Sequence, residues 1–361
     1  MKRILLLVAV VFMAFSACES NNTSYGSTYE EIQDQIIDNS RKDVQVTDEC
    51  ITAANITEKM KENAEQYRQS THRGDDGRNG VYVYSKSVNM YNGHPEQLAA
   101  RIAVLGFNDV YLSPGKEQIT GATPWLRTFI ATLKGYGIQT HALRIADNSI
   151  YVNEAKVETE VELIKTYNNA VAPDERFYGI AADLEPHTCK GSSKPAALTY
   201  EWNSQTGYGA GGSNDKLLQL TIERLQKAKG LMTKQAPQLS EAVSYNFQIQ
   251  ANANKLSYGT IPQFLASCDW VVLMSYLGNK EDIWSKSEPS LAAAKEKKQS
   301  VSVCVKTAVN NDEGDGLQPK GWQYLLETAR YIMEKGKAYT SFRGFDVFNY
   351  EGLETMWEKA E

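Results

Sequence analysis

The feature that most limits the fold of this chain is a regular alternation that begins near residue 81. Short apolar, strand-like runs occur at residues 81–84, 109–112, 138–143, 178–184, 242–247, 270–276, 301–305 and 344–348. Segments with helical spacing follow them at residues 96–105, 124–136, 154–168, 215–235, 261–266, 291–298, 322–335 and 353–359. Strands that alternate with helices of this length indicate βαβ units and a parallel sheet. Eight such pairs predict a (β/α)8 TIM barrel over residues 76–361, with a doubly wound open sheet as the alternative.

The N-terminus has the layout of an export signal. Lys2 and Arg3 precede an apolar stretch at residues 4–15 that is too short to span a bilayer easily. The sequence Phe15-Ser-Ala-Cys18 resembles the lipobox of bacterial lipoproteins, which implies cleavage before Cys18 and a lipid on its thiol. We therefore expect a signal peptide at 1–17, a polar tether at 18–29 and a helical segment at 30–75 ahead of the barrel. An uncut or conventionally cleaved signal peptide is the alternative.

This layout predicts an extracytoplasmic protein held on a bacterial membrane by its lipid, with the outer membrane as the expected location. The net charge of −6 gives no basic surface for a nucleic-acid partner. The sequence has no nucleotide-binding glycine fingerprint and no close Cys/His spacing, so we expect neither a cofactor nor a metal. An oxidising compartment permits disulfides among the remaining cysteines without requiring them: Cys50, Cys189, Cys268 and Cys304.

In a barrel of this type, catalytic side chains lie at the carboxyl ends of the strands. Polar residues gather at those predicted ends: Tyr84, Ser85, Lys86, Ser113, Lys116, His141, Arg144, Asp183, Glu185, His187, Tyr245, Asn246, Gln248, Tyr276, Lys306, Asp346 and Asn349. The fourth strand has the richest end, because two carboxylates follow its apolar run and a proline stops it.

Those two carboxylates, Asp183 and Glu185, share the parity of Ala181, so all three are expected to face the barrel interior. Two acids this close cannot both ionise comfortably in a shielded site, so one pKa should rise toward that of a general acid. We expect a protonated Glu185 beside an ionised Asp183. The structural alternative is an acid that is solvated or that pairs with Lys306 or Arg144.

The stretch Tyr178-Gly-Ile-Ala-Ala-Asp-Leu-Glu185 resembles the strand-four signature DGxDxDxE of glycoside hydrolase family 18, the chitinase-like barrels. Gly179, Asp183 and Glu185 match the signature, whereas Tyr178 and Ala181 stand where the family has aspartates. Val272-Leu-Met-Ser-Tyr276 is similar to the family pattern MxYD, with Leu277 in place of its aspartate. The resemblance implies a substrate-assisted mechanism. Glu185 would be the acid, Asp183 would steady the N-acetyl group that attacks the anomeric carbon, and Tyr276 would donate a hydrogen bond to it.

Other residues are expected to bind the glycan. The long segment at 186–213 carries Trp202, whose ring suits the face of a sugar, although packing under the loop is an equal expectation. The full predicted substrate-binding set is Tyr84, His141, Tyr245, Asn246, Gln248, Trp202 and Asp346.

A conventional retaining glycosidase fits less well, because the seventh strand ends without a carboxylate. Asp346 or Glu351 could still partner Glu185 in an inverting arrangement. The sequence thus predicts a glycoside hydrolase acting on N-acetylhexosamine-containing glycans. The alternatives are a non-catalytic glycan-binding barrel with a degenerate active site and a structural or partner-binding lipoprotein.

Overall fold

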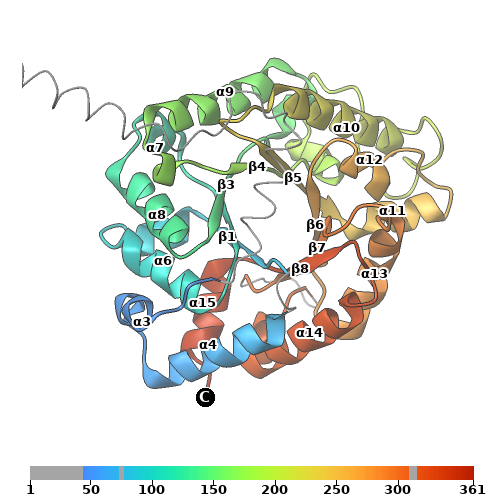
Figure 1. The fold of residues 1–361 in the computed structure, drawn as a ribbon. Helices are drawn as coiled ribbons and strands as arrows, with labels where there is room; N and C mark the ends of the chain where they lie inside the picture. Colours follow the sequence, from blue (N-terminus) through green and yellow to red (C-terminus); the bar gives the residue numbers. More distant parts are fainter. Residues whose placement is uncertain (1–43, 73–76, 309–314) are drawn as a thin grey trace, which may run out of the picture.

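The computed structural model describes residues 44–72, 77–308 and 315–361. Within these ranges, eight parallel strands pair in chain order and β8 pairs with β1, so the sheet closes into a barrel (Figure 1). The (β/α)8 prediction is confirmed, and the open-sheet alternative is wrong. The strands are β1 Gly80–Val83, β2 Asp109–Leu112, β3 Gln139–Leu143, β4 Gly179–Ala182, β5 Gln238–Ser244, β6 Trp270–Met274, β7 Val301–Lys306 and β8 Phe342–Phe348.

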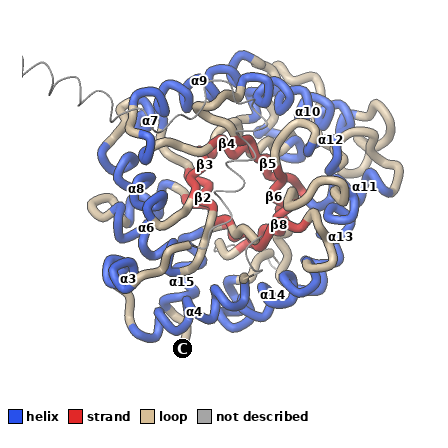
Figure 2. Tube along the Cα trace, in the orientation of Figure 1, coloured by secondary structure: helices blue, strands red, loops and turns tan. Residues whose placement is uncertain are grey.

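Helices form a ring around the strands (Figure 2). One helix or helix pair follows each strand, as a parallel sheet requires. The helices of this ring are α5 Ser85–Met90, α6 Pro95–Val104, α7 Lys116–Thr120, α8 Pro124–Gly135, α9 Ala155–Ala170, α10 Ser213–Leu231, α11 Tyr245–Asn252, α12 Ile261–Leu265, α13 Lys280–Ala293, α14 Gly321–Gly336 and α15 Tyr350–Glu358.

Two helices precede the barrel, α3 Asp48–Ala54 and α4 Glu58–Thr71, and they lie on the outside of the helix ring (Figure 1). Tyr67 of α4 packs on Trp322 of α14 with ring centroids 5.7 Å apart, and Trp357 of α15 donates a hydrogen bond of 2.7 Å to the carbonyl of Met60. These contacts attach α4 to α14 and α15, the last two helices of the chain. The predicted signal peptide at 1–17, the tether at 18–29 with Cys18, and residues 30–43 lie outside the described residues, and the lipid anchor stays a prediction.

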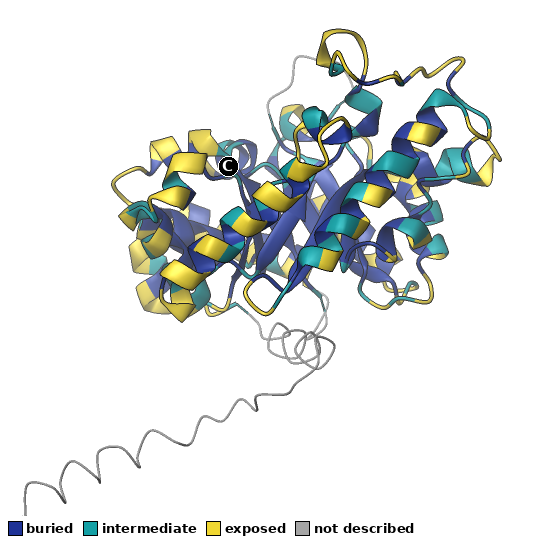
Figure 3. Ribbon diagram, turned by 90° about the horizontal axis from the view of Figure 1, so that it is seen from above, coloured by how far each residue is buried: buried dark blue, intermediate teal, exposed yellow. Residues whose placement is uncertain are grey.

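The main core lies between the strands and the helices, so the strands are buried in the middle of the molecule (Figure 3). Alternate strand residues face the other way and fill the barrel interior. That interior cluster contains Tyr82, Tyr111, Leu143, Ala181, Trp270, Val272 and Cys304. Cys50, Cys189, Cys268 and Cys304 are all buried and unpaired, so none of these cysteines forms a disulfide. No helix in the described ranges is long and apolar enough to cross a bilayer.

A charged network fills the amino-terminal end of the barrel. Asp109, the first residue of β2, accepts hydrogen bonds of 2.8 and 2.6 Å from Arg78 and one of 2.9 Å from Arg343. Nε2 of His141 lies 3.0 Å from the same carboxylate. Burial alone would raise the pKa of Asp109, but Arg78 and Arg343 hold it well below its usual range. Asp109 is therefore the ionised centre of this network. We call the network of Asp109, Arg78, Arg343 and His141 the barrel floor.

Candidate active site

Asp183 and Glu185 follow β4 directly, as the sequence predicts. Gly179 fixes this strand close to β5, because a Cβ at that position would lie 2.2 Å from the carbonyl oxygen of Gln238. After Ala182 the chain leaves the sheet, and Pro186 begins a short 3-10 helix, Pro186–Thr188. The Asp183 N–H still bonds to the carbonyl of Ile145 at 3.3 Å, which anchors the end of the strand.

The two carboxyls form an electrostatically coupled pair. Burial raises the pKa of Asp183 to about 7, and the charge of Glu185 adds to that rise. Burial also raises the pKa of Glu185, whose side chain is 34% exposed. The pair therefore keeps a shared proton up to a pH well above the usual range of a carboxyl. The expected assignment of that proton to Glu185, beside an ionised Asp183, stays a prediction.

Neither acid is neutralised by the basic residues that the structural alternative invoked. Arg144 donates instead to Glu160 at 2.6 Å, and Nζ of Lys306 lies 3.9 Å from Asp315. Among the described residues, Oδ1 of Asp183 is a buried oxygen without a hydrogen-bond partner. Buried polar atoms are nearly always hydrogen-bonded, and unpaired ones call for an explanation such as a ligand or a catalytic role.

His187 contacts the outer acid, with Nε2 3.5 Å from Oε1 of Glu185. Burial, with a further contribution from Lys190, lowers the pKa of His187 to about 4, so the imidazole is neutral near pH 7. Its ring packs edge-on against Trp202 and Phe247 at centroid distances of 6.3 and 5.8 Å. Trp202 is thus buried beneath its own loop. Of the two expectations for this residue, the structure fits packing under the loop and not an exposed surface for a sugar ring.

Aromatic rings surround the acids at the barrel mouth. Tyr84 follows β1, Tyr276 lies two residues beyond β6, and Phe348 ends β8. The Phe348 ring lies 5.6 Å from that of Tyr84 and 5.2 Å from that of Tyr276, and all three side chains are partly exposed. Burial raises the pKa of both tyrosines, and the charge of Asp183 contributes to each rise. Both phenols are therefore neutral near pH 7 and lie at the mouth where the sequence placed Tyr84 and Tyr276, while their roles toward a substrate stay predictions.

His141 and Asp346 lie below the mouth of the barrel. The prediction that they lie at its rim is therefore wrong. His141 is fully buried between Asp109 and the ring of Trp270, at a centroid distance of 5.2 Å. Asp346 is 1% exposed and accepts hydrogen bonds from Ser302 at 2.6 Å and from the N–H of Gly80 at 2.6 Å. Both side chains belong to the barrel interior and are not exposed to a ligand at the mouth.

The fifth strand ends earlier than predicted, which moves three candidate residues onto a helix. β5 covers Gln238–Ser244, and Tyr245, Asn246 and Gln248 belong to α11. Asn246 is exposed, and Tyr245 packs against the main core from the outside. Gln248 is buried and holds the N–H of Ile261 at 2.9 Å, so its amide connects two helices. The structure does not bring this group to the acid pair.

Glu241 is a third carboxyl that sequence reasoning missed. It is fully buried on β5, and its Oε1 accepts the N–H of Leu184, the residue between the two acids, at 3.0 Å. Burial raises the pKa of Glu241 well above its usual range, and the charge of Asp183 raises it further. Glu241 shares one face of β5 with the apolar Leu239 and Val243, and a lone acid on the apolar face of a strand is the signal that could have revealed it.

We predict that Glu241 positions the acids through its hydrogen bond to Leu184. Glu241→Gln keeps a carbonyl oxygen for that N–H, so activity should stay within about threefold of wild type. Glu241→Leu leaves the N–H buried and unpaired, and displacement of the acids should lower kcat by about tenfold or more. Turnover is measured per folded molecule, with folding checked by near-UV circular dichroism. Equal turnover in the two variants would rule out this role.

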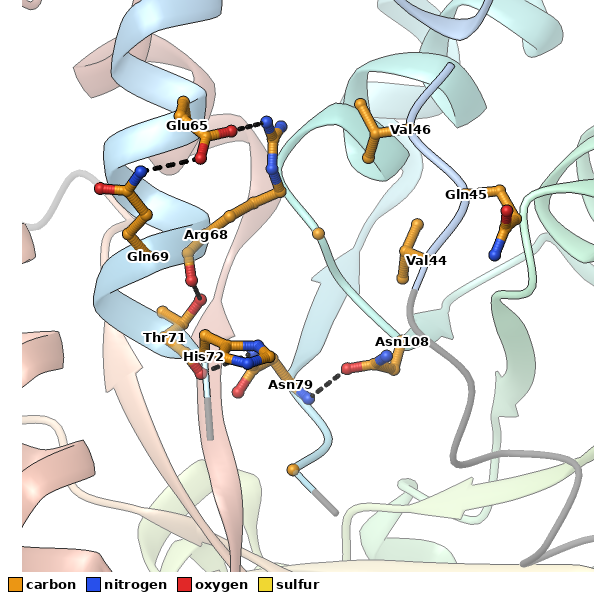
Figure 4. Close-up of a pocket in the computed structure, with 12 residues that line it drawn as sticks. Val44, Gln45, Val46, Glu65, Arg68, Gln69, Thr71, His72, Asn79 and Asn108 are labelled. Atoms are coloured by element: carbon orange, nitrogen blue, oxygen red, sulfur yellow. Dashed lines mark hydrogen bonds and ion pairs between the residues drawn. The ribbon is translucent and has the colours of Figure 1, made fainter. Parts of the chain in front are cut away.

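A cavity of about 640 Å³ lies at the opposite end of the barrel (Figure 4). It is lined by α4, residues 44–46 and the segments that precede β1 and β2. Three of its polar side chains already have partners: Asn79 donates to the carbonyl of Thr71, Asn108 accepts the N–H of Asn79, and Arg68 pairs with Glu65. This cavity contains none of the candidate catalytic residues. In the described part of the chain, no cluster of three or more His, Cys, Asp or Glu residues has the geometry of a metal site.

No protein-family model and no curated protein matches the chain. Several solved structures resemble it. A family 18 chitinase from Pseudoalteromonas aurantia is 15% identical, with a TM-score of 0.49 over 79% of this chain and 98% of that one. A family 18 chitinase from Cycas revoluta in complex with (GlcNAc)4 is 11% identical, with a TM-score of 0.47 over 78% and 98%. The spore cortex-lytic enzyme SleL of Bacillus cereus is 9% identical, with a TM-score of 0.46 over 76% and 70%. These three likenesses are too low to establish family membership.

Proposed function

We propose that this protein is a glycoside hydrolase that acts on N-acetylhexosamine-containing glycans, with Glu185 as the general acid. The observation that carries the proposal is the acid pair: two coupled carboxyls with raised pKa values at the mouth of a (β/α)8 barrel, neither of them neutralised by a basic partner among the described residues. The match of Gly179, Asp183 and Glu185 to the family 18 signature supports the same assignment.

Substrate binding favours the protonated form of Glu185. In the free pair the two carboxyls share one proton below about pH 7. A sugar bound over Glu185 removes water from its exposed side, and this desolvation raises the pKa of Glu185 further. Glu185 then holds the proton and can transfer it to the glycosidic oxygen. Asp183, now ionised, faces the developing positive charge.

The nucleophile must come from the substrate or from water. Asp346 is buried and hydrogen-bonded inside the barrel, and Glu351 is paired with Lys86, which disfavours the inverting arrangement. The acetamide oxygen of the substrate would bond to the anomeric carbon while the bond to the leaving oxygen breaks. Tyr276 can donate a hydrogen bond to that acetamide. A water that gives its proton to Glu185 would then bond to the anomeric carbon while the bond to the acetamide oxygen breaks, which restores the acetamide and the protonated Glu185.

The aromatic rings supply the sugar-binding surface. Tyr84, Phe348 and Tyr276 lie beside one another around the mouth, and each is partly exposed. Aromatic faces suit the apolar C–H faces of a pyranose ring, while the two phenol hydroxyls can bond to sugar oxygens. Phe348 was not predicted, although its parity with Asp346 and its place at the end of β8 indicate an inward-facing ring.

A non-catalytic glycan-binding barrel is the second candidate, favoured by Ala181. This small residue lies beneath Asp183 where the resembling family has an aspartate, so no carboxyl below the pair helps to hold its proton. The test is a screen of chitin, peptidoglycan and N-glycan oligosaccharides for both cleavage and binding. Cleavage supports the hydrolase, and binding without cleavage across the panel supports the second candidate. The absence of both cleavage and binding would overturn both candidates.

The pH profile of kcat/KM should follow the shared proton. Because the pKa of Asp183 is raised to about 7, the pair keeps one proton below that pH and loses it above, so activity should fall as pH rises through about 7. Asp183→Asn removes the neighbouring charge, which lowers the pKa of Glu185 and moves the basic limb to lower pH. The limb is measured on the residual activity of the variant. A limb that stays in place would contradict the coupling.

A further inference from the structure

Lys306 presents an ammonium group at the same barrel mouth, and the proposed reaction gives it no role. It is the last residue of β7 and pairs in register with Phe348 of β8. Its Nζ lies 5.9 Å from the centroid of the Tyr276 ring. The cation therefore lies near the Tyr276 ring, on a residue whose backbone is the register partner of Phe348.

The Lys306 ammonium lacks a hydrogen-bond acceptor among the described residues. The Lys306 side chain is only 17% exposed, and its ion-pair partner among the described residues, Asp315, lies at 3.9 Å, beyond hydrogen-bond distance. Within the described ranges, no acceptor lies within hydrogen-bond distance of Nζ. A charged group that is largely removed from water normally has hydrogen-bonded partners, because an unmatched one costs desolvation energy.

The backbone holds Lys306 in this place. The N–H of Leu317 bonds to the Lys306 carbonyl at 2.8 Å, and Gly316 approaches so closely that a Cβ would lie 2.9 Å from that carbonyl oxygen. Gly316 also has a φ of +84°, which favours glycine. The returning chain thus fixes the backbone of the last residue of β7, and with it the point from which the Lys306 side chain extends.

We propose that Lys306 makes the site selective for N-acetylhexosamine glycans that carry a carboxylate, such as the lactyl carboxylate of peptidoglycan strands. This inference rests on the proposed function, because it names the substrate class of the same site. A sugar ring held by Tyr276 and Phe348 would place a substituent near Nζ, and a carboxylate there would supply the acceptor that Lys306 lacks. A neutral chito-oligosaccharide offers no anion at this point.

The test compares two tetrasaccharides of equal length on the full chain carrying Glu185→Gln, which leaves ligands uncut. One is neutral chitotetraose, and the other is a peptidoglycan tetrasaccharide freed of its peptides. Calorimetry should give tighter binding of the acidic ligand. Adding Lys306→Met, which keeps the aliphatic stem, should weaken the acidic ligand by about tenfold or more and the neutral one by less than about twofold. The acidic preference should also shrink as salt rises.

Lys280→Met is the matched control, because Lys280 is also a largely buried lysine but is paired with Glu327 at 3.2 Å. It should change neither affinity. If both ligands bind and Lys306→Met affects them equally or not at all, the carboxylate selectivity is wrong, and the proposed function is judged by the cleavage screen alone. If the wild-type protein neither binds nor cleaves any glycan of that screen, the proposed function fails and this inference fails with it.

Discussion

Replacing Glu185 with Gln is expected to lower kcat by about 10²–10⁴-fold, the usual cost of removing a general acid. Gln has nearly the same shape but cannot transfer a proton to the leaving oxygen. Glycan affinity should change only a few-fold, because the aromatic rings and Tyr276 stay in place. The measurement is single-turnover cleavage of whichever oligosaccharide the wild-type protein cuts, alongside calorimetry on the same ligand.

Glu351→Gln is the control for this result. Glu351 is another glutamate on the same side of the barrel, but it is paired with Lys86 and lies on α15. Its loss should cost less than about threefold in kcat, in keeping with the small effect of a surface pair. If Glu185→Gln cleaves as fast as wild type, Glu185 is not the acid. A large loss in Glu351→Gln would instead favour the inverting arrangement.

The fold and the fourth strand could be predicted because their signals are local. A run of apolar residues stopped by Pro186 defines the end of β4, and period-2 spacing gives the parity that places Ala181 and Asp183 inside the barrel. Eight repeats of strand and helix leave few topologies, and the right-handed crossover favours closure.

The fifth strand was misplaced because its polar residues face the barrel interior. Gln238 and Ser240 are buried next to the charged floor, so the beginning of β5 lacks the apolar run that marks the other strands. The aromatic stretch after it has strand-like composition, yet Ser244 caps a helix there by accepting the N–H of Asn246. Tertiary burial thus outweighed local propensity, and Glu241 was missed together with the strand that carries it.

The sequence correctly predicted which strand residues face the barrel interior. It could not predict how far below the mouth each of them lies. His141 and Asp346 do face inward, but each lies two residues before the end of its strand, and the sheet register aligns His141 with Tyr111 and Gly179. Those neighbours lie below the acid pair. Which residue reaches the mouth depends on the stagger between strands, which is a property of the closed sheet and is absent from any single strand.

The barrel floor gives the largest expected effect on stability. Asp109→Asn should lower the free energy of unfolding by about 3–5 kcal/mol, the typical cost of breaking a buried ion pair by removing one partner. Asp109 is 1% exposed and is shared by Arg78 and Arg343, so its loss leaves both positive charges without their carboxylate in a site that water cannot solvate. Urea titration monitored by tryptophan fluorescence measures the change without adding salt that would screen the charges.

Lys337→Ala is the control for the floor, because it breaks the exposed pair between Lys337 and Glu334, whose side chains are 60% and 73% exposed. Its effect should stay within about 0.5 kcal/mol. A loss below about 1 kcal/mol in Asp109→Asn would mean that the two arginines relax toward other acceptors. Since the floor lies at the amino ends of the strands and the acids at the carboxyl ends, Asp109→Asn should also leave the pH profile of any glycan cleavage unchanged at temperatures where the variant is folded. Such a result would show that stability depends on the barrel floor and that catalysis depends on the residues at the mouth.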